Sequence, residues 1–120
     1  MVNTTTFLTA VKGQIRTYTL TKSTYMAAGT GTTAATVADT TLETETERNA
    51  RQESTEGTSD VIVSLFLNST EGNGDDLTEV GALDAASTGN LMMRTTFPVI
   101  SKTSAVDVWI DVEEQIDVTQ

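Results

Sequence analysis

The sequence contains no cysteine and no histidine in its 120 residues. Without cysteine there are no disulfides, thiolate metal sites or cysteine nucleophiles, and the redox compartment stays undetermined. Without histidine the chain lacks the commonest general base and the commonest zinc ligand. Because a chain of this length forms only one compact domain, these two absences argue against an enzyme. We expect no catalytic residue and no cofactor.

Long apolar runs are also missing. No run approaches the roughly 20 residues that a membrane helix needs. The N-terminal stretch MVNTTTFLTAVKGQIR has neither the basic start nor the long apolar centre of a signal peptide. We therefore expect a soluble protein with no membrane partner.

Basic residues are few. Seven face 17 acidic residues, which gives a net charge of −10. A field of this sign repels nucleic acid and anionic lipid, so neither is expected as a partner. An acidic surface with only three lysines stays soluble in concentrated salt, where screening removes self-repulsion. A halophilic source is one interpretation, and an ordinary acidic surface is the other.

Residues 1–22 form the first predicted unit, a helix or an extended arm. Phe7, Leu8, Val11 and Ile15 recur at helical spacing and Tyr18 continues the stripe, with Asn3 or a nearby threonine as the cap. Threonines and a glycine are weak helix formers, which leaves the arm open. The stripe is too short to fold alone, so it must lie on the main domain or on a neighbouring chain.

Residues 23–120 form the second predicted unit, a single β domain. A short strand is expected over 23–28. The carboxylates at 43, 45 and 47 alternate with threonines, which favours a strand over 42–51 with one solvated acidic face, with a short helix as the alternative. Further strands are expected over 60–67, which is apolar on both faces and suits a central position, and over 78–84 and 91–97.

The last predicted strand has the clearest pattern. Apolar residues occupy alternate positions, interrupted only by Glu114, and acidic or polar residues lie between most of them, which places one face in a core and the other in water. Trp109 is the exception on the wet face, where it either covers a sheet edge or meets a partner. The inward-facing residues are Val106, Val108, Ile110, Val112, Ile116 and Val118.

Turns recur about every 10 residues, which indicates antiparallel hairpins. The sequence therefore predicts a mainly β protein: an antiparallel β-sandwich, jelly-roll or immunoglobulin-like, with one N-terminal helix.

The stretch AAGTGTT, from Ala27 to Thr33, raises the question of a phosphate-binding loop. It lacks the third glycine of a dinucleotide fingerprint and the Gly-Lys-Ser/Thr of a P-loop. An ordered turn is the better interpretation, because glycine permits positive φ and threonine hydroxyls satisfy nearby backbone groups.

Two other candidate sites remain. The oxygen-rich segment with Asn73, Asp75, Asp76 and Glu79 is a calcium candidate, although it lacks EF-hand spacing and acidic turns are commonly just solvated. Asn3 and Asn68 begin N-glycosylation acceptor patterns, which arise by chance in a threonine-rich chain.

Several segments occur in a characteristic order along the chain: Ala28–Thr33, Asp39–Glu43 with Glu45, Glu79–Ala85, Gly89, Arg94–Phe97 and Ile100–Thr103. In this order and spacing they resemble the fibre-attachment modules of the phage tail-collar fibre type. The resemblance covers about residues 25–110, and this chain has alanine where the family pattern usually has leucine, at Ala27 or Ala28.

The resemblance implies a non-enzymatic structural protein located in the virion of a tailed virus. Such a protein docks as a symmetric homo-oligomer, either as a tail, baseplate or neck component for fibre attachment or as a capsid decoration or turret. A haloarchaeal host follows if the chain is halophilic. The alternative is a stand-alone carbohydrate- or calcium-binding β-sandwich adhesin domain.

The expected partners are other virion proteins and further copies of the chain, with no small-molecule substrate. The candidate contact residues combine the N-terminal stripe with the tryptophan on the wet face of the last strand. The opposing interpretation is that they are core. These residues are Phe7, Leu8, Val11, Ile15 and Trp109.

Overall fold

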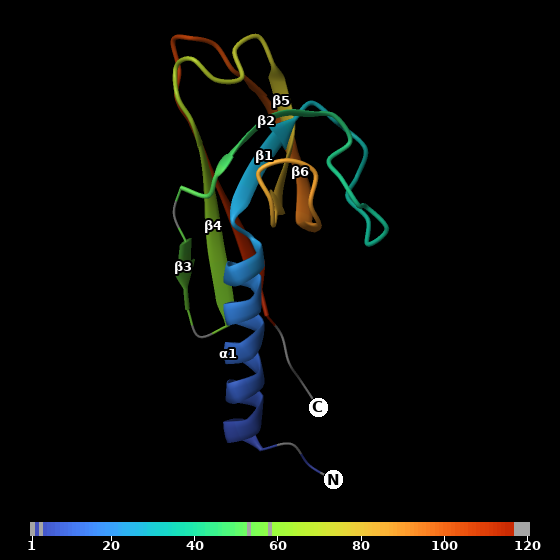
Figure 1. Cartoon of the computed structure of the whole chain (residues 1–120), viewed down its shortest axis with the longest axis vertical. Helices are drawn as coiled ribbons and strands as arrows, with labels where there is room; N and C mark the ends of the chain where they lie inside the picture. Colours follow the sequence, from blue (N-terminus) through green and yellow to red (C-terminus); the bar gives the residue numbers. More distant parts are fainter. Residues whose placement is uncertain (1, 3, 53, 58, 117–120) are drawn as a thin grey trace.

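The computed structural model describes residues 2, 4–52, 54–57 and 59–116 and shows two antiparallel sheets with one N-terminal helix (Figure 1). The predicted β-sandwich with an N-terminal helix is confirmed. One sheet has the strand order β2-β1-β5-β6 and the other β3-β4-β7. The elements are α1 (Thr5–Lys22), β1 (Tyr25–Gly29), β2 (Glu45–Ala50), β3 (Ser54–Glu56), β4 (Asp60–Leu67), β5 (Asp76–Leu83), β6 (Leu91–Ser101) and β7 (Val108–Gln115).

The helix predicted within residues 1–22 is present and begins after a threonine cap. The Thr4 hydroxyl accepts a hydrogen bond from the Phe7 amide at 3.2 Å, which satisfies one of the free N–H groups of the first turn. Asn3, the other predicted cap, lies outside the described residues. Figure 1 shows α1 along the long axis of a molecule of 55 × 26 × 25 Å, with its first turns extending past the ends of β3 and β4.

Gly13 stands in the middle of α1, and its replacement by alanine is expected to stabilise the protein by about 0.5–1 kcal/mol. A methyl group there would meet only the Arg16 guanidinium, at 3.7 Å, which is ordinary contact. The gain comes from the lower conformational freedom of alanine in the unfolded chain. Urea unfolding followed by circular dichroism measures it, and a loss of stability would show that the site is crowded.

The core lies between the two sheets and contains the apolar side chains predicted for the central strand. Val61, Val63, Leu65 and Leu67 of β4 are fully buried. Because β4 pairs with both β3 and β7, it is the central strand of its sheet, as its composition predicts.

The alternation predicted for the last strand is confirmed over β7 and fails at Val106. Val108 is buried and Ile110 and Val112 are half-buried, whereas the odd-numbered residues between them are exposed. Val106 is 45% exposed because it belongs to the preceding turn, where its amide donates to the Thr103 carbonyl. Val118 lies outside the described residues.

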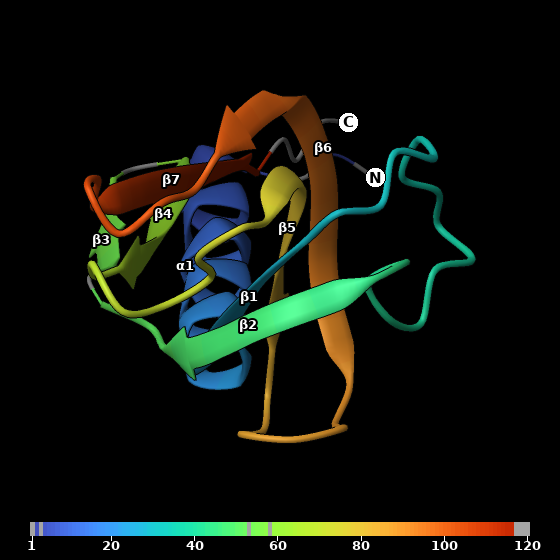
Figure 2. The same ribbon diagram turned by 90° about the horizontal axis from the view of Figure 1, so that it is seen from above.

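Two strand boundaries differ from the prediction. β2 begins at Glu45, so Glu43 does not belong to an alternating acidic face. Its carboxylate instead accepts hydrogen bonds from the amides of Thr32 and Thr33. β6 continues through Pro98 to Ser101, which is possible because β6 is an edge strand and proline needs no ladder partner on the open side (Figure 2).

Candidate functional site

The glycine-threonine loop folds over a buried carboxylate. Glu79 on β5 is fully buried. Its Oε1 accepts hydrogen bonds from the amides of Thr44 at 2.7 Å and Gly31 at 3.3 Å, and its Oε2 accepts one from the amide of Glu43 at 3.0 Å. One carboxylate therefore holds the start and the end of the loop between β1 and β2.

Arg94 on β6 completes this arrangement. Its Nε donates to Glu79 Oε2 at 2.8 Å, Nη1 donates to Asp39 Oδ2 at 2.9 Å and Nη2 donates to the Thr33 carbonyl at 2.8 Å. Only 4% of the arginine side chain is exposed. We call Asp39, Glu79 and Arg94 the carboxylate–arginine cluster.

Gly29, at the end of β1, and Gly31, in the loop, are required because the Glu79 carboxylate lies close to them, and not because of unusual backbone angles. Positive φ occurs within the described residues at Gly72, Gly74, Gly89 and Thr88, so the predicted role of glycine in the AAGTGTT turn is wrong. A Cβ atom on Gly29 or Gly31 would instead lie 2.5 or 2.8 Å from Glu79 Oε1. The backbone reaches the buried carboxylate only because these residues have no side chain.

The charges of the cluster stabilise one another. Burial raises the pKa of Glu79, but the amides of Thr44 and Glu43 and the Arg94 guanidinium outweigh burial and lower it overall. The pKa of Asp39 is also lowered, first by the Thr36 amide. A carboxylate that stays ionised at neutral pH is a poor general acid. The geometry therefore points to a structural role, the fixing of the loop.

This arrangement predicts a pH dependence of stability. A lowered pKa in the folded state adds stability that is present above the unfolded pKa and is lost as the pH falls through the folded value. Stability should therefore decline below the ordinary glutamate value of 4.5. Urea midpoints between about pH 3 and 7 measure this decline. In Glu79→Gln the curve should be flatter, and an unchanged curve would assign the effect to other carboxylates.

The calcium candidates do not converge on one point. Glu79 belongs to the carboxylate–arginine cluster. The Asn73 amide oxygen accepts a hydrogen bond from the Lys102 ammonium at 2.9 Å, and Asp76 accepts one from the Ser101 hydroxyl at 3.0 Å. Of these candidates, Asn73 is therefore already held by the Lys102 ammonium. Within residues 2, 4–52, 54–57 and 59–116, no three carboxylate side chains gather as a metal site would require.

The glycosylation pattern at Asn68 lies in an exposed turn after β4. Its side-chain oxygen accepts hydrogen bonds from the amide and the hydroxyl of Thr70, at 2.8 and 2.7 Å. Asn3 lies outside the described residues.

The predicted contact residues of α1 lie outside the main core cluster. Phe7 is 54% exposed and Ile15 36%, while Leu8 and Val11 are half-buried. Tyr18, which continues the stripe but is not among the predicted contacts, is 61% exposed. The helical periodicity of the sequence already places it beside the other four.

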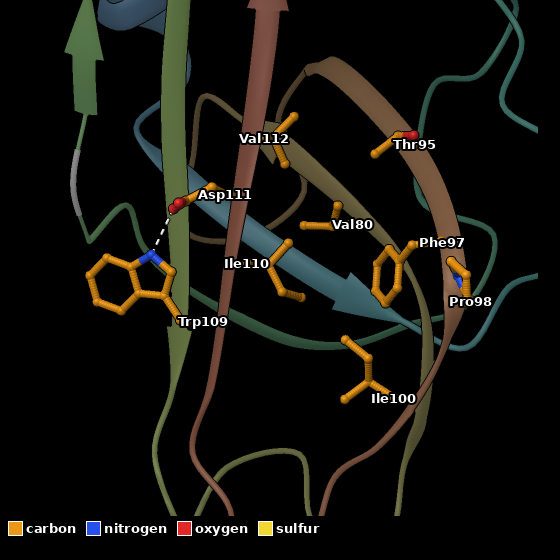
Figure 3. A pocket seen from close by; sticks show the side chains of 9 residues that line it. All are labelled: Val80, Thr95, Phe97, Pro98, Ile100, Trp109, Ile110, Asp111 and Val112. Atoms are coloured by element: carbon orange, nitrogen blue, oxygen red, sulfur yellow. Dashed lines mark hydrogen bonds between the residues drawn. The ribbon is translucent and has the colours of Figure 1, made fainter.

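A second apolar surface lies where the two sheets part at β6 and β7. Ile110 and Val112 point toward Phe97 and Ile100 across a groove of about 350 Å³, and Val80 forms its floor (Figure 3). Reasoning from the sequence did not identify the β6 side of this groove, because strand alternation alone does not show which core edge stays open.

Trp109 lies on the outer face of β7. Its ring packs at a tilt against Phe66, with the ring centroids 5.7 Å apart, and its Nε1 donates to Asp111 at 2.6 Å. It remains 46% exposed. It therefore covers β4 with one face and presents the other to its surroundings.

No model of a known protein family matches this chain, and no curated protein matches it at a significant level. None of the helices in the described part of the chain has the length and apolar character to cross a membrane.

Proposed function

We propose that this protein is a non-enzymatic structural component of a tailed virus particle that docks on the virion as a symmetric oligomer. The observation that carries the proposal is the exposure of large apolar side chains at two separate places, the α1 stripe and the β6–β7 region. They include Phe7, Ile15, Tyr18, Val99, Val106 and Trp109. Large apolar side chains that stay exposed favour contact between proteins where they gather into a patch.

The segments that resemble the tail-collar fibre module meet in space, which supports the proposal. The carboxylate–arginine cluster draws one residue from each of three of them: Asp39, Glu79 and Arg94. Gly29 and Gly31, from the first segment, approach the same carboxylate. In this chain these segments together fix one loop against one sheet. A module of the same kind would share this arrangement.

The mechanism is repeated weak contact. A ring of identical subunits multiplies each contact by its valency, so a small apolar patch on each copy is sufficient to hold the ring on a symmetric surface. The role at the tail, the neck or the capsid surface follows from which virion protein lies opposite the patch.

The proposal includes a haloarchaeal host, which predicts that salt stabilises the protein. With a net charge of −10, screening of self-repulsion should raise Tm by on the order of 5 °C between about 0.1 and 2 M NaCl. Differential scanning calorimetry measures this rise. Sodium sulfate at matched ionic strength controls for salting-out, and a Tm that falls with NaCl would contradict a halophilic origin.

The oligomeric state tests the proposal directly. Native mass spectrometry and size-exclusion chromatography in about 2 M salt, where surface charge is screened, should show a trimer, pentamer or hexamer. A chain that is monomeric at every concentration would overturn the proposal. A thermal shift with calcium or glycans would instead favour the adhesin alternative.

A further inference from the structure

The exposed stripe of α1 has the spacing of a helix that packs against another helix. Leu8, Val11, Ile15 and Tyr18 follow one another at intervals of three, four and three residues. These intervals correspond to positions a, d, a and d of two successive heptads. Two of the four side chains, Ile15 and Tyr18, are exposed, and the other two are only half-buried.

The stripe is distinct from the face that α1 turns toward its own sandwich. On that face Lys12 Nζ donates to the Ser59 hydroxyl at 3.2 Å, Arg16 Nε lies 3.6 Å from a Glu56 carboxylate oxygen, and Thr19 is buried. The two basic residues in the middle of the helix are thus directed to the same chain. The heptad stripe beside them is left largely uncovered.

Charge favours a second copy as the occupant of the stripe. The first acidic residue of the sequence is Asp39. None of the 17 acidic residues therefore lies in α1. Two copies that approach through their sandwiches bring acidic surfaces together, whereas two copies that approach through α1 bring no carboxylates together. Of the three basic residues of α1, Lys12 and Arg16 are directed to their own chain, and the Lys22 ammonium lies 6.0 Å from the centroid of the Tyr18 ring. The first turns of α1 also extend past the ends of β3 and β4 (Figure 1).

We infer that α1 of one copy packs in parallel along α1 of neighbouring copies through Leu8, Val11, Ile15 and Tyr18. The inference rests on the proposed function, because a ring that docks on one surface has its subunits in the same orientation. The sandwich already holds each helix, so association requires no separate helix nucleation. This pairing of helices leaves the β6–β7 groove and Trp109, which lie on opposite faces of β7, available for other contacts.

The first test compares two substitutions in α1 at high salt. Ile15→Asp places a charge in the stripe, and Thr17→Asp makes the same addition at an exposed position on the opposite side of the helix. Sedimentation should show association weakened at least about a hundredfold for Ile15→Asp and unchanged for Thr17→Asp. Far-UV circular dichroism and the urea midpoint of each variant check that the sandwich is intact.

The second test uses the absence of cysteine in the chain. A single Val11→Cys variant should form a disulfide between copies under mild oxidation, because parallel packing places each Val11 opposite the same residue of its neighbour. Thr17→Cys is the control and should stay reduced. If Val11→Cys cross-links only to an Ile15→Cys variant mixed with it, the helices are antiparallel and the inference is overturned.

The failures of the inference and of the proposed function are distinguishable. An oligomer that survives Ile15→Asp, with no Val11→Cys cross-link, overturns the pairing of helices and leaves the virion proposal standing on its other surface. A wild-type chain that is monomeric at all concentrations overturns the virion proposal itself.

Discussion

Replacing Glu79 by alanine is expected to destabilise the fold by about 3–5 kcal/mol, because it removes the fully buried carboxylate that pairs with the Arg94 guanidinium, which keeps Asp39 as a carboxylate partner. Arg94 is 4% exposed, and the amides of Gly31, Glu43 and Thr44 would lose their acceptor at the same time. A domain of this size has a total stability of about 5–15 kcal/mol, so the variant should be marginally folded. Chemical unfolding in urea measures the loss.

The matched control is Glu113→Ala. Glu113 lies on the exposed face of β7 and accepts a hydrogen bond from the neighbouring Gln115 side chain. Its removal should change the stability by no more than about 0.5 kcal/mol. Equal losses in the two glutamate variants would mean that the carboxylate–arginine cluster contributes no more than an ordinary surface charge.

Replacing Gly29 by alanine is expected to cost about 3 kcal/mol or more, although it adds only one methyl group. The new Cβ would collide with the Thr44 carbonyl oxygen and lie 2.5 Å from Glu79 Oε1. The backbone of the loop would have to move away, and with it the hydrogen bonds to the buried carboxylate. Denaturant midpoints measure the cost.

The same substitution at Gly13 is the comparison for Gly29→Ala. It adds the same methyl group in α1, where the nearest atom is at ordinary contact distance. Opposite signs for the two variants are expected. If both stabilise the chain, the loop tolerates a side chain beside Glu79, and its glycines are not required by close approach.

Local periodicity was sufficient to predict α1 and β7. A helix that packs on one side of a domain shows its pattern of apolar residues within a few positions along the chain. A strand with one face in the core does the same. Within residues 59–116, the predicted inward-facing set failed at Val106, where the preceding turn removes the residue from the strand. The same periodicity identified the predicted contact residues on α1. It also placed Tyr18 on their side of the helix.

The carboxylate–arginine cluster could not be predicted in this way. Glu79 resembles any acidic residue of a half-exposed strand, and its partners Gly31, Thr44 and Arg94 are 48, 35 and 15 residues away. Lys102 is similar, because it is buried against Asn73 from 29 residues away. The segments that carry the resemblance to a tail-collar module contain both Glu79 and Lys102. The resemblance does not show which contacts these two side chains make.

The sequence by itself determined the class of fold, the acidic character of the chain and the absence of histidine and cysteine chemistry, because these depend on composition and on neighbours along the chain. The tertiary structure decided which charges are buried, why Gly29 and Gly31 are glycine, and which apolar side chains stay uncovered. Those features depend on residues brought together from distant parts of the chain, and burial is a property of the packed molecule.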